Sequence, residues 1–384
     1  MSHATGSARP SAIAGYEDWP AYVQNHPRYR VASQEGQAFA EAIGVPEIPL
    51  RPDVSVHWEE THDGVTTSQL SWQLGFGPRT TGWLIRPAGS SGPLPGVLAL
   101  HCHGGNKFGG ADRLVELPEQ HPSADAAKAG HYDGRALATD VARRGFAVLA
   151  HDTFAWGSRR FDLSVPPWRT ASALEARQAQ WREDGVVPSD ADLYNAAAGI
   201  HEETVAKTAG LLGTSLAGMV AHDDLAALEI LASLPHVDQD RLGCIGFSGG
   251  GGRSLALAVL SPRIKSYVVT CMMATFQSLL PSYLDAHSWL LQTPGLWKLG
   301  DWPGLTAGAR DANLLVQYAL ADELFTEDGM RDAHRVLESV HPHGNYTGSF
   351  WPGGHVFTAR MQQEALAFLA TTLNLRSTSS TQGN

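Results

Sequence analysis

From residue 80 onward, short apolar runs alternate with longer segments whose apolar residues recur every three or four positions. A short apolar run is typical of a strand buried on both faces, and the longer period is typical of a helix packed by one face. Buried strands are predicted at TTGWLIR (80–86), PGVLAL (95–100), FAVLAH (146–151), RLGCIGF (241–247), SYVVTCMM (266–273) and LLVQYAL (314–320). Strands that alternate with helices predict an α/β fold, with a mostly parallel central sheet and helices on both faces.

Helical spacing fills the intervals between these strands. The clearest case is LAGMVAHDDLAALEILASL (216–234), which ends before Pro235 and predicts a long packing helix. Further helices are predicted at 134–144, 330–340 and 358–373, and a short strand at 346–351. Before the first buried strand, residues 54–74 alternate partially around Asp63-Gly64, a pair typical of hairpin turns.

Three segments interrupt the alternation, and we interpret them as insertions into one domain at 107–131, 153–212 and 276–302. The second is expected to form a lid over the carboxyl edge of the sheet, where ligands bind in open α/β sheets. The domain is predicted to span 53–373. Residues 1–52 form an N-terminal extension that we expect to be partly disordered, and the low-complexity tail 374–384 is expected to be disordered.

Composition narrows the class of protein. The 384 residues are 43% hydrophobic and 17% charged, enough to bury a large core, and the net charge of −11 argues against partners such as nucleic acid or an anionic membrane. No apolar run is long enough to span a bilayer, and the first residues lack the features of a signal peptide, so a cytoplasmic protein is expected. Cys102, Cys244 and Cys271 all lie in apolar runs, which predicts buried, reduced thiols rather than disulfides or metal ligands.

Candidate chemistry appears where the strand 241–247 meets the next helix, in Gly246-Phe247-Ser248-Gly249-Gly250. This is a G-x-S-x-G pattern between a buried strand and a helix, the context in which a sharp turn exposes a nucleophilic serine. The alternative is a glycine-rich turn with an incidental serine. We predict Ser248 as the nucleophile, with the backbone N–H of Gly249 as one donor to an oxyanion.

A serine hydroxyl needs a base, and the base needs an acid that orients it; on such a sheet the expected chain order is serine, acid, histidine. Asp322 follows the strand LLVQYAL and is predicted as the acid, with a helix N-cap as the alternative role. Glu323 and Asp311 compete for this role, but Glu323 is one position further on, and Asp311 precedes the strand at the wrong edge.

His355 lies in WPGGHVF, on a glycine-containing loop after the last predicted strand, and is predicted as the base. His341 and His343 precede that strand and are expected to be solvent-exposed histidines at a helix end. The second oxyanion donor is expected from a backbone N–H of Gly104, Gly105 or Asn106, in an H-G-G motif after strand 95–100.

Several other residues carry more than one interpretation. His101 and His103 alternate along one strand, but no third ligand follows at a suitable spacing, so no metal site is predicted and His103 is expected to shape the oxyanion loop near the substrate.

Phe247 and Trp156 are further substrate-contact candidates; the tryptophans of the insertions could equally fill the core. The neighbouring charges Asp223 and Asp224 are expected to be solvated or paired, and Arg253 is expected to be a packing or salt-bridge residue. The glycines 249–252 lack the G-K-[ST] of a phosphate loop.

With these residues identified, the chain resembles the α/β-hydrolase superfamily, and within it the dienelactone hydrolase-like and acetyl xylan esterase-like branch. The likeness rests on LPGVLALHCHGG, GRALATDVARRGFAVLAHDTFAWGSRR, SLAGMVAHDDLAALEILASLPHVDQDRLGCIGFSGGGG, ALADELF and WPGGHVF. It implies the same three residues, Ser248, Asp322 and His355, as nucleophile, acid and base. Dienelactone hydrolases proper use a cysteine nucleophile, so the serine here favours ordinary ester hydrolysis.

The sequence therefore predicts a serine carboxylic-ester hydrolase that works through an acyl-enzyme without a cofactor. A short acyl group, such as acetyl on a small molecule or sugar, is what the resemblance implies for the substrate. A serine peptidase or amidase on the same fold is the alternative, although the first 80 residues are too few for the N-terminal propeller that such peptidases carry. A non-catalytic binding protein is the third possibility, which the presence of all three residues disfavours. No oligomeric state follows from the sequence.

Overall fold

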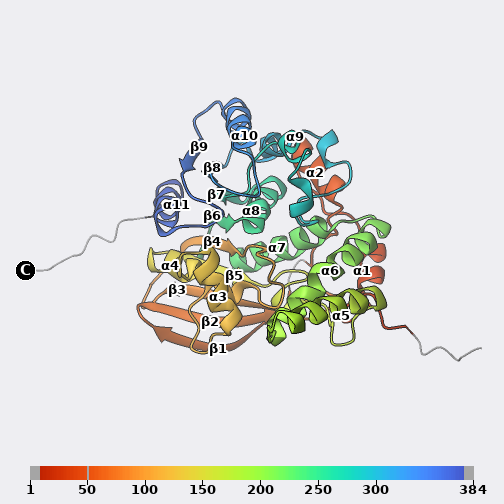
Figure 1. The fold of residues 1–384 in the computed structure, drawn as a ribbon. Coiled ribbons are helices and arrows are strands. Elements are labelled where there is room, and N and C mark those ends of the chain that lie inside the picture. Colours follow the sequence, from red (N-terminus) through yellow and green to blue (C-terminus); the bar gives the residue numbers. More distant parts are fainter. Residues whose placement is uncertain (1–8, 50–51, 376–384) are drawn as a thin grey trace, which may run out of the picture.

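The computed structural model describes residues 9–49 and 52–375. Residues 1–8 of the N-terminal extension and residues 376–384 of the tail that was predicted to be disordered (374–384) lie outside these ranges. A single nine-stranded sheet in the order β1-β2-β3-β5-β4-β6-β7-β8-β9 forms the centre of the molecule (Figure 1). The strands are Val54–His62 (β1), Val65–Trp72 (β2), Thr80–Pro87 (β3), Leu94–Leu100 (β4), Ala147–His151 (β5), Val237–Phe247 (β6), Ile264–Thr270 (β7), Asn313–Ala319 (β8) and Tyr346–Trp351 (β9).

The sheet has an antiparallel part and a parallel part. The first three strands form an antiparallel meander, and β3 pairs antiparallel with β5. From β5 through β4 and β6 to β9 every pair is parallel. Because parallel strands end at the same edge, the loops after β4, β6, β8 and β9 can meet there, and these are the loops that carry the predicted chemistry.

Helices cover both faces of the sheet, as the alternating pattern predicts. The helices are Trp19–Asn25 (α1), Gln34–Ile43 (α2), Pro122–His131 (α3), Leu137–Arg143 (α4), Trp168–Glu183 (α5), Asp190–Leu211 (α6), Leu216–Ser233 (α7), Gly249–Leu260 (α8), Phe276–Leu279 (α9), Glu327–Val340 (α10) and Ala359–Thr372 (α11). α7 and α8 pack on one face with the N-terminal helices beyond them, and α4 and α11 pack on the other (Figure 1). In the described part of the chain, no helix combines the length and the apolar character needed to cross a membrane.

The N-terminal extension contributes to the core between residue 9 and residue 49. Tyr16 and Trp19 are fully buried among aromatic rings such as Phe154 and Phe161, which belong to the second insertion. The extension therefore packs against this insertion.

The three insertions differ in structure. The first contains the short 3-10 helix Ala111–Leu114 and α3, and the second contains α5 and α6, which pack against each other. The third, after β7, contains α9 and the 3-10 helices Leu284–Ala286 and Leu296–Lys298, and a further 3-10 helix, Trp302–Ala309, begins at its end. Figure 1 shows α5 and α6 together beside α1, at the side of the sheet.

The structure corrects one expectation and specifies another. His341 is buried, not solvent-exposed, because its ring packs against the 3-10 helix Trp302–Ala309, where Nε2 lies 3.1 Å from Thr306 Oγ1. Asp223 and Asp224 are paired and fully buried: Arg159 lies beside Asp223, and Arg253 beside Asp224.

Candidate active site

Ser248 occupies a sharp turn between β6 and α8. Its backbone has φ 55° and ψ −126°, a conformation that L-residues rarely adopt. The turn is tight because a Cβ on Gly246 would lie 2.1 Å from the backbone carbonyl of Gly250, so no larger residue fits without a shift. The strand, the strained serine and the glycines together form the nucleophile turn that the G-x-S-x-G pattern predicts.

Asp322, His355 and Ser248 form one hydrogen-bonded chain. Asp322 follows β8, and its Oδ2 accepts from His355 Nδ1 at 2.7 Å. His355 follows β9, and its Nε2 accepts from Ser248 Oγ at 2.8 Å. The carboxylate side chain is 1% exposed and the imidazole is 20% exposed, so the acid is shielded from water while the base remains accessible. This is the geometry in which a histidine can remove a proton from a serine hydroxyl.

The two residues that compete with Asp322 for the role of the acid are both exposed to solvent. Glu323 is exposed beside Asp322, and Asp311 is exposed at the opposite end of β8. The backbone N–H of Leu324 donates to Asp322 Oδ1 at 2.9 Å and fixes the second carboxylate oxygen. This bond is of the kind that a helix N-cap makes, which was the alternative role for Asp322. Its other oxygen, Oδ2, accepts from His355.

Two backbone N–H groups near Ser248 could hold an oxyanion. The Gly249 N–H opens α8, where the first N–H groups have no partner within the helix. A Cβ on Gly249 would lie 3.0 Å from the backbone nitrogen of His103, which places the start of α8 against the loop after β4. The N–H groups of His103 and Gly104 are therefore the candidates for the second donor.

The expected donors Gly105 and Asn106 are already engaged, which corrects two of the three predicted positions. The Gly105 N–H donates to His103 Nδ1 at 3.1 Å, and the Asn106 N–H donates to the His103 carbonyl at 3.2 Å. The physical reason is that the chain turns back on itself at Gly104 and Gly105, both of which have positive φ.

A cavity of about 270 Å³ opens at Ser248. Its lining includes four apolar side chains, those of Met272, Leu290, Leu291 and Leu324. His131 and His287 also line the cavity, and burial lowers the pKa of both rings, which keeps them neutral near the base. The cavity therefore offers a small, mostly uncharged space next to the serine.

Of the three predicted substrate contacts, His103 lines this cavity and the other two do not. Phe247 is buried under the site, with its ring centroid 4.7 Å from that of His355. Trp156 is buried behind His103, with ring centroids 5.2 Å apart. The prediction that Phe247 and Trp156 contact substrate is therefore wrong. Both side chains are buried in the core, where Phe247 packs against His355 and Trp156 packs against His103.

Glu202, on α6, is a residue of the site that the sequence did not single out. Its carboxylate contacts His103 and Ser288, both of which line the cavity. Glu202 lies in a helix of mixed polarity about 46 residues before the serine, and no motif or spacing marks it. Only the folded arrangement brings it into contact with residues that line the cavity.

The donor set next to His355 does not suit a metal ion. Within the described ranges, one group of three potential ligands was found, and it consists of Cys271, Asp322 and His355. Burial raises the pKa of the Cys271 thiol well above its usual range, which disfavours the thiolate that a zinc site requires. Asp322 and His355 are also already bonded to each other.

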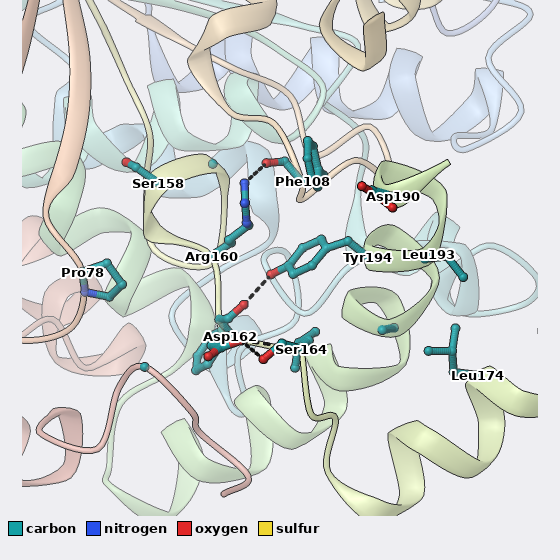
Figure 2. Close-up of a pocket in the computed structure, with 15 residues that line it drawn as sticks. Pro78, Phe108, Ser158, Arg160, Asp162, Ser164, Leu174, Asp190, Leu193 and Tyr194 are labelled. Carbon is teal, nitrogen blue, oxygen red and sulfur yellow. Dashed lines mark hydrogen bonds between the residues drawn. The ribbon is translucent and has the colours of Figure 1, made fainter. Parts of the chain in front are cut away.

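A second cavity of about 710 Å³ lies between the loop after residue 157 and helices α5 and α6 (Figure 2). Figure 2 shows Arg160 between Phe108 and Tyr194; its guanidinium donates to the Phe108 carbonyl at 3.0 Å. The guanidinium carbon is 4.5 Å from the Phe108 ring centroid. The three residues of the hydrogen-bonded chain do not line this cavity, so it is separate from the serine site.

Comparison with known proteins agrees with this fold. A family model described as acetyl xylan esterase (AXE1) matches residues 216–281, which include α7, β6 and the Ser248 turn. The protein YtaP of Bacillus subtilis (strain 168), described as a hydrolase, is 24% identical over 331 residues, 84% of this chain and 94% of that protein.

Two solved structures show the likeness in three dimensions. A glucuronoyl esterase from Solibacter usitatus matches with a TM-score of 0.59 and 14% identity, covering 96% of this chain and 98% of that chain. Acetyl xylan esterase 1 from Thermoanaerobacterium sp. JW/SL YS485 matches with a TM-score of 0.52 and 17% identity, covering 92% and 98%. The chain has the α/β-hydrolase fold, and the predicted fold class is confirmed.

Proposed function

We propose that this chain is a serine carboxylic-ester hydrolase with Ser248 as nucleophile, His355 as general base and acid, and Asp322 as the group that orients the imidazole. The observation that carries the proposal is the continuous chain of hydrogen bonds, 2.7 Å and 2.8 Å long, that ends at the cavity. The similarity to the acetyl xylan esterase model supports the ester class.

The reaction follows from the geometry in two halves. In the first, Ser248 Oγ attacks the ester carbonyl carbon as its proton passes to His355 Nε2. The carbonyl oxygen becomes an oxyanion, which the Gly249 N–H and an N–H of the His103–Gly104 segment stabilise; each such donor contributes about 3 kcal/mol. The intermediate then expels the alcohol, which takes the proton from His355, and leaves an acyl-enzyme.

In the second half, water replaces the alcohol. His355 Nε2 accepts a proton from the water as it attacks the acyl carbon, and the new oxyanion occupies the same N–H groups. When this intermediate collapses, Ser248 leaves with the proton from His355 and the carboxylic acid is released. Asp322 keeps the proton-bearing Nδ1 directed away from the serine throughout both halves.

The proposed substrate is a short acyl ester of a small molecule or sugar. A cavity of about 270 Å³ whose lining includes Met272, Leu290 and Leu291 fits a small acyl group. The relatives named as acetyl xylan esterases favour acetyl on a carbohydrate. The proposal includes a cytoplasmic location, which the three free, buried cysteines favour.

The test is hydrolysis of p-nitrophenyl esters from acetate to decanoate by the wild type and by Ser248→Ala. We expect Ser248-dependent turnover that is fastest with acetate and falls as the chain outgrows the cavity. A fluorophosphonate should label Ser248 in the wild type, and Glu203→Gln, on the exposed side of α6, serves as an active control. Turnover that survives in folded Ser248→Ala would overturn the mechanism, and cleavage of matched anilides in preference to esters would make the protein an amidase.

A further inference from the structure

The carboxylate of Glu202 accepts hydrogen bonds from four donors. They are His103 Nε2 at 3.0 Å, Lys107 Nζ at 2.6 Å, Ser288 Oγ at 2.6 Å and the backbone N–H of Trp289 at 2.9 Å. The Glu202 side chain is 8% exposed, so these contacts replace nearly all of its hydration. A carboxylate with two oxygens has about four acceptor positions, and all of them are used here.

The donors come from two segments that border the serine cavity. His103 and Lys107 belong to the loop after β4, and Ser288 and Trp289 belong to the third insertion. His103 and Ser288 themselves line the cavity. One side chain of α6 therefore connects the oxyanion loop to the third insertion, which also borders the cavity.

The bond to Glu202 also determines which ring nitrogen of His103 carries the proton. Because Nε2 donates to the carboxylate, Nδ1 is free to accept from the Gly105 N–H at 3.1 Å. The His103 ring therefore links Glu202 to the backbone at Gly105, and it holds the turn that contains Gly104. The His103 backbone nitrogen lies against Gly249 at the start of α8.

We propose that Glu202 is a positioning residue for the oxyanion loop, acting through His103, and that it couples the second insertion to ester hydrolysis. This inference rests on the function proposed above. Glu202 contacts no reacting atom. It fixes the loop whose N–H groups would stabilise the oxyanion of the tetrahedral intermediate formed on Ser248. In this proposal the second insertion, in addition to any role as a lid, holds the oxyanion loop in position.

The charge of Lys107 supports this arrangement. Lys107 is 4% exposed, and its ammonium group lies 4.6 Å from the ring centroid of Trp156. Burial alone raises the pKa of Glu202, but the hydrogen bond from His103 and the charge of Lys107 outweigh it and hold this pKa well below its usual range. Glu202 is therefore ionised over the working pH range and can accept from all four donors.

The test is Glu202→Gln, with Glu203→Gln as the matched control. A glutamine has the same shape, but its NH2 group is a donor and would face groups that are themselves donors. At least one of the hydrogen bonds that Glu202 accepts, such as the one from His103, must therefore be lost. Glu203 is the next residue, is 64% exposed and pairs with Lys207, so its change leaves the site intact.

Two kinetic readouts separate positioning from general stability. We expect kcat for p-nitrophenyl acetate to fall about 10- to 100-fold in Glu202→Gln with KM within about twofold, less than the loss from removing a donor outright. Inhibition by a trifluoromethyl ketone, which forms an oxyanion on the serine, should weaken by the same factor. Glu203→Gln should match the wild type in both measurements.

Unchanged kcat, or a loss of kcat with unchanged binding of the trifluoromethyl ketone, would overturn this inference. If Glu202→Gln does not fold, His103→Phe carries the test alone, and wild-type kcat and inhibition in that variant would overturn it equally. Where both single variants fold, the double variant should lose no more activity than the more impaired of the two single variants, because Glu202 acts through its contact with His103. Ser248→Ala distinguishes the two proposals: activity without Ser248 overturns the proposed function, whereas Ser248-dependent activity that ignores Glu202 overturns only the positioning role.

Discussion

Arg253 Nη1, on α8, donates to the backbone carbonyl of His101 at 3.1 Å. The helix that begins after the nucleophile is therefore bonded to the end of β4, the strand that leads into the oxyanion loop. The same guanidinium donates to both oxygens of Asp224, at 3.0 Å and 2.6 Å, inside the core. Arg253 thus links the helix after the nucleophile to the end of β4 and to a buried carboxylate of α7.

Arg253→Leu is expected to destabilise the fold by about 3–5 kcal/mol, because Asp224 would keep a buried charge without its cation. Urea unfolding measures this loss. The control is Arg263→Leu, whose guanidinium pairs with Glu229 at 3.2 Å on a partly exposed surface and should cost less than about 1 kcal/mol. Equal stabilities for the two variants would contradict the structural role of the buried pair.

Asp322→Asn should reduce kcat by about 10⁴-fold with little change in the fold, because an amide no longer holds the His355 proton on Nδ1. Steady-state hydrolysis of p-nitrophenyl acetate and the circular dichroism spectrum are the measurements. Glu323→Gln is the matched control, since Glu323 is adjacent and exposed. If instead Glu323→Gln showed the large loss, the acid would be assigned wrongly.

Gly246→Ala should abolish activity and lower stability, because its Cβ would lie 2.1 Å from the backbone of Gly250. Gly252→Ala provides the comparison within the same stretch. A Cβ there meets its nearest atom, in Met272, at 3.5 Å, and alanine is the better helix former. Labelling of Ser248 by a fluorophosphonate and thermal unfolding report on both variants; an active Gly246→Ala enzyme would mean that the turn is looser than described.

The stability contributed by Glu202 should depend on pH in one direction. Its pKa is lowered in the folded state, so the contribution is fully present above the ordinary value of 4.5 and is lost as the pH falls. The difference in free energy of unfolding between the wild type and Glu202→Gln should be constant from about pH 6 to 8 and should shrink below about pH 4.5. Urea titrations at several pH values measure it, and a difference that grows on acidification would contradict the ion pair with Lys107.

The sequence by itself determined the parallel sheet, its covering helices and the order of the three residues at Ser248, Asp322 and His355. These follow from local patterns: apolar runs of strand length, glycines around one serine, and polar residues directly after buried strands. Local patterns suffice because parallel strands must end at a common edge, whatever the detailed packing.

Only the tertiary structure decided the rest of the site. The N–H groups of Gly105 and Asn106 face inward because the loop closes on the His103 side chain and carbonyl, a turn that the H-G-G motif does not encode. Glu202 and Ser288 are 86 residues apart in the chain and meet at the edge of the cavity, and Trp156 turns into the core. Contacts between segments so distant in the chain depend on how the insertions pack, and neither periodicity nor spacing along the sequence carries that information.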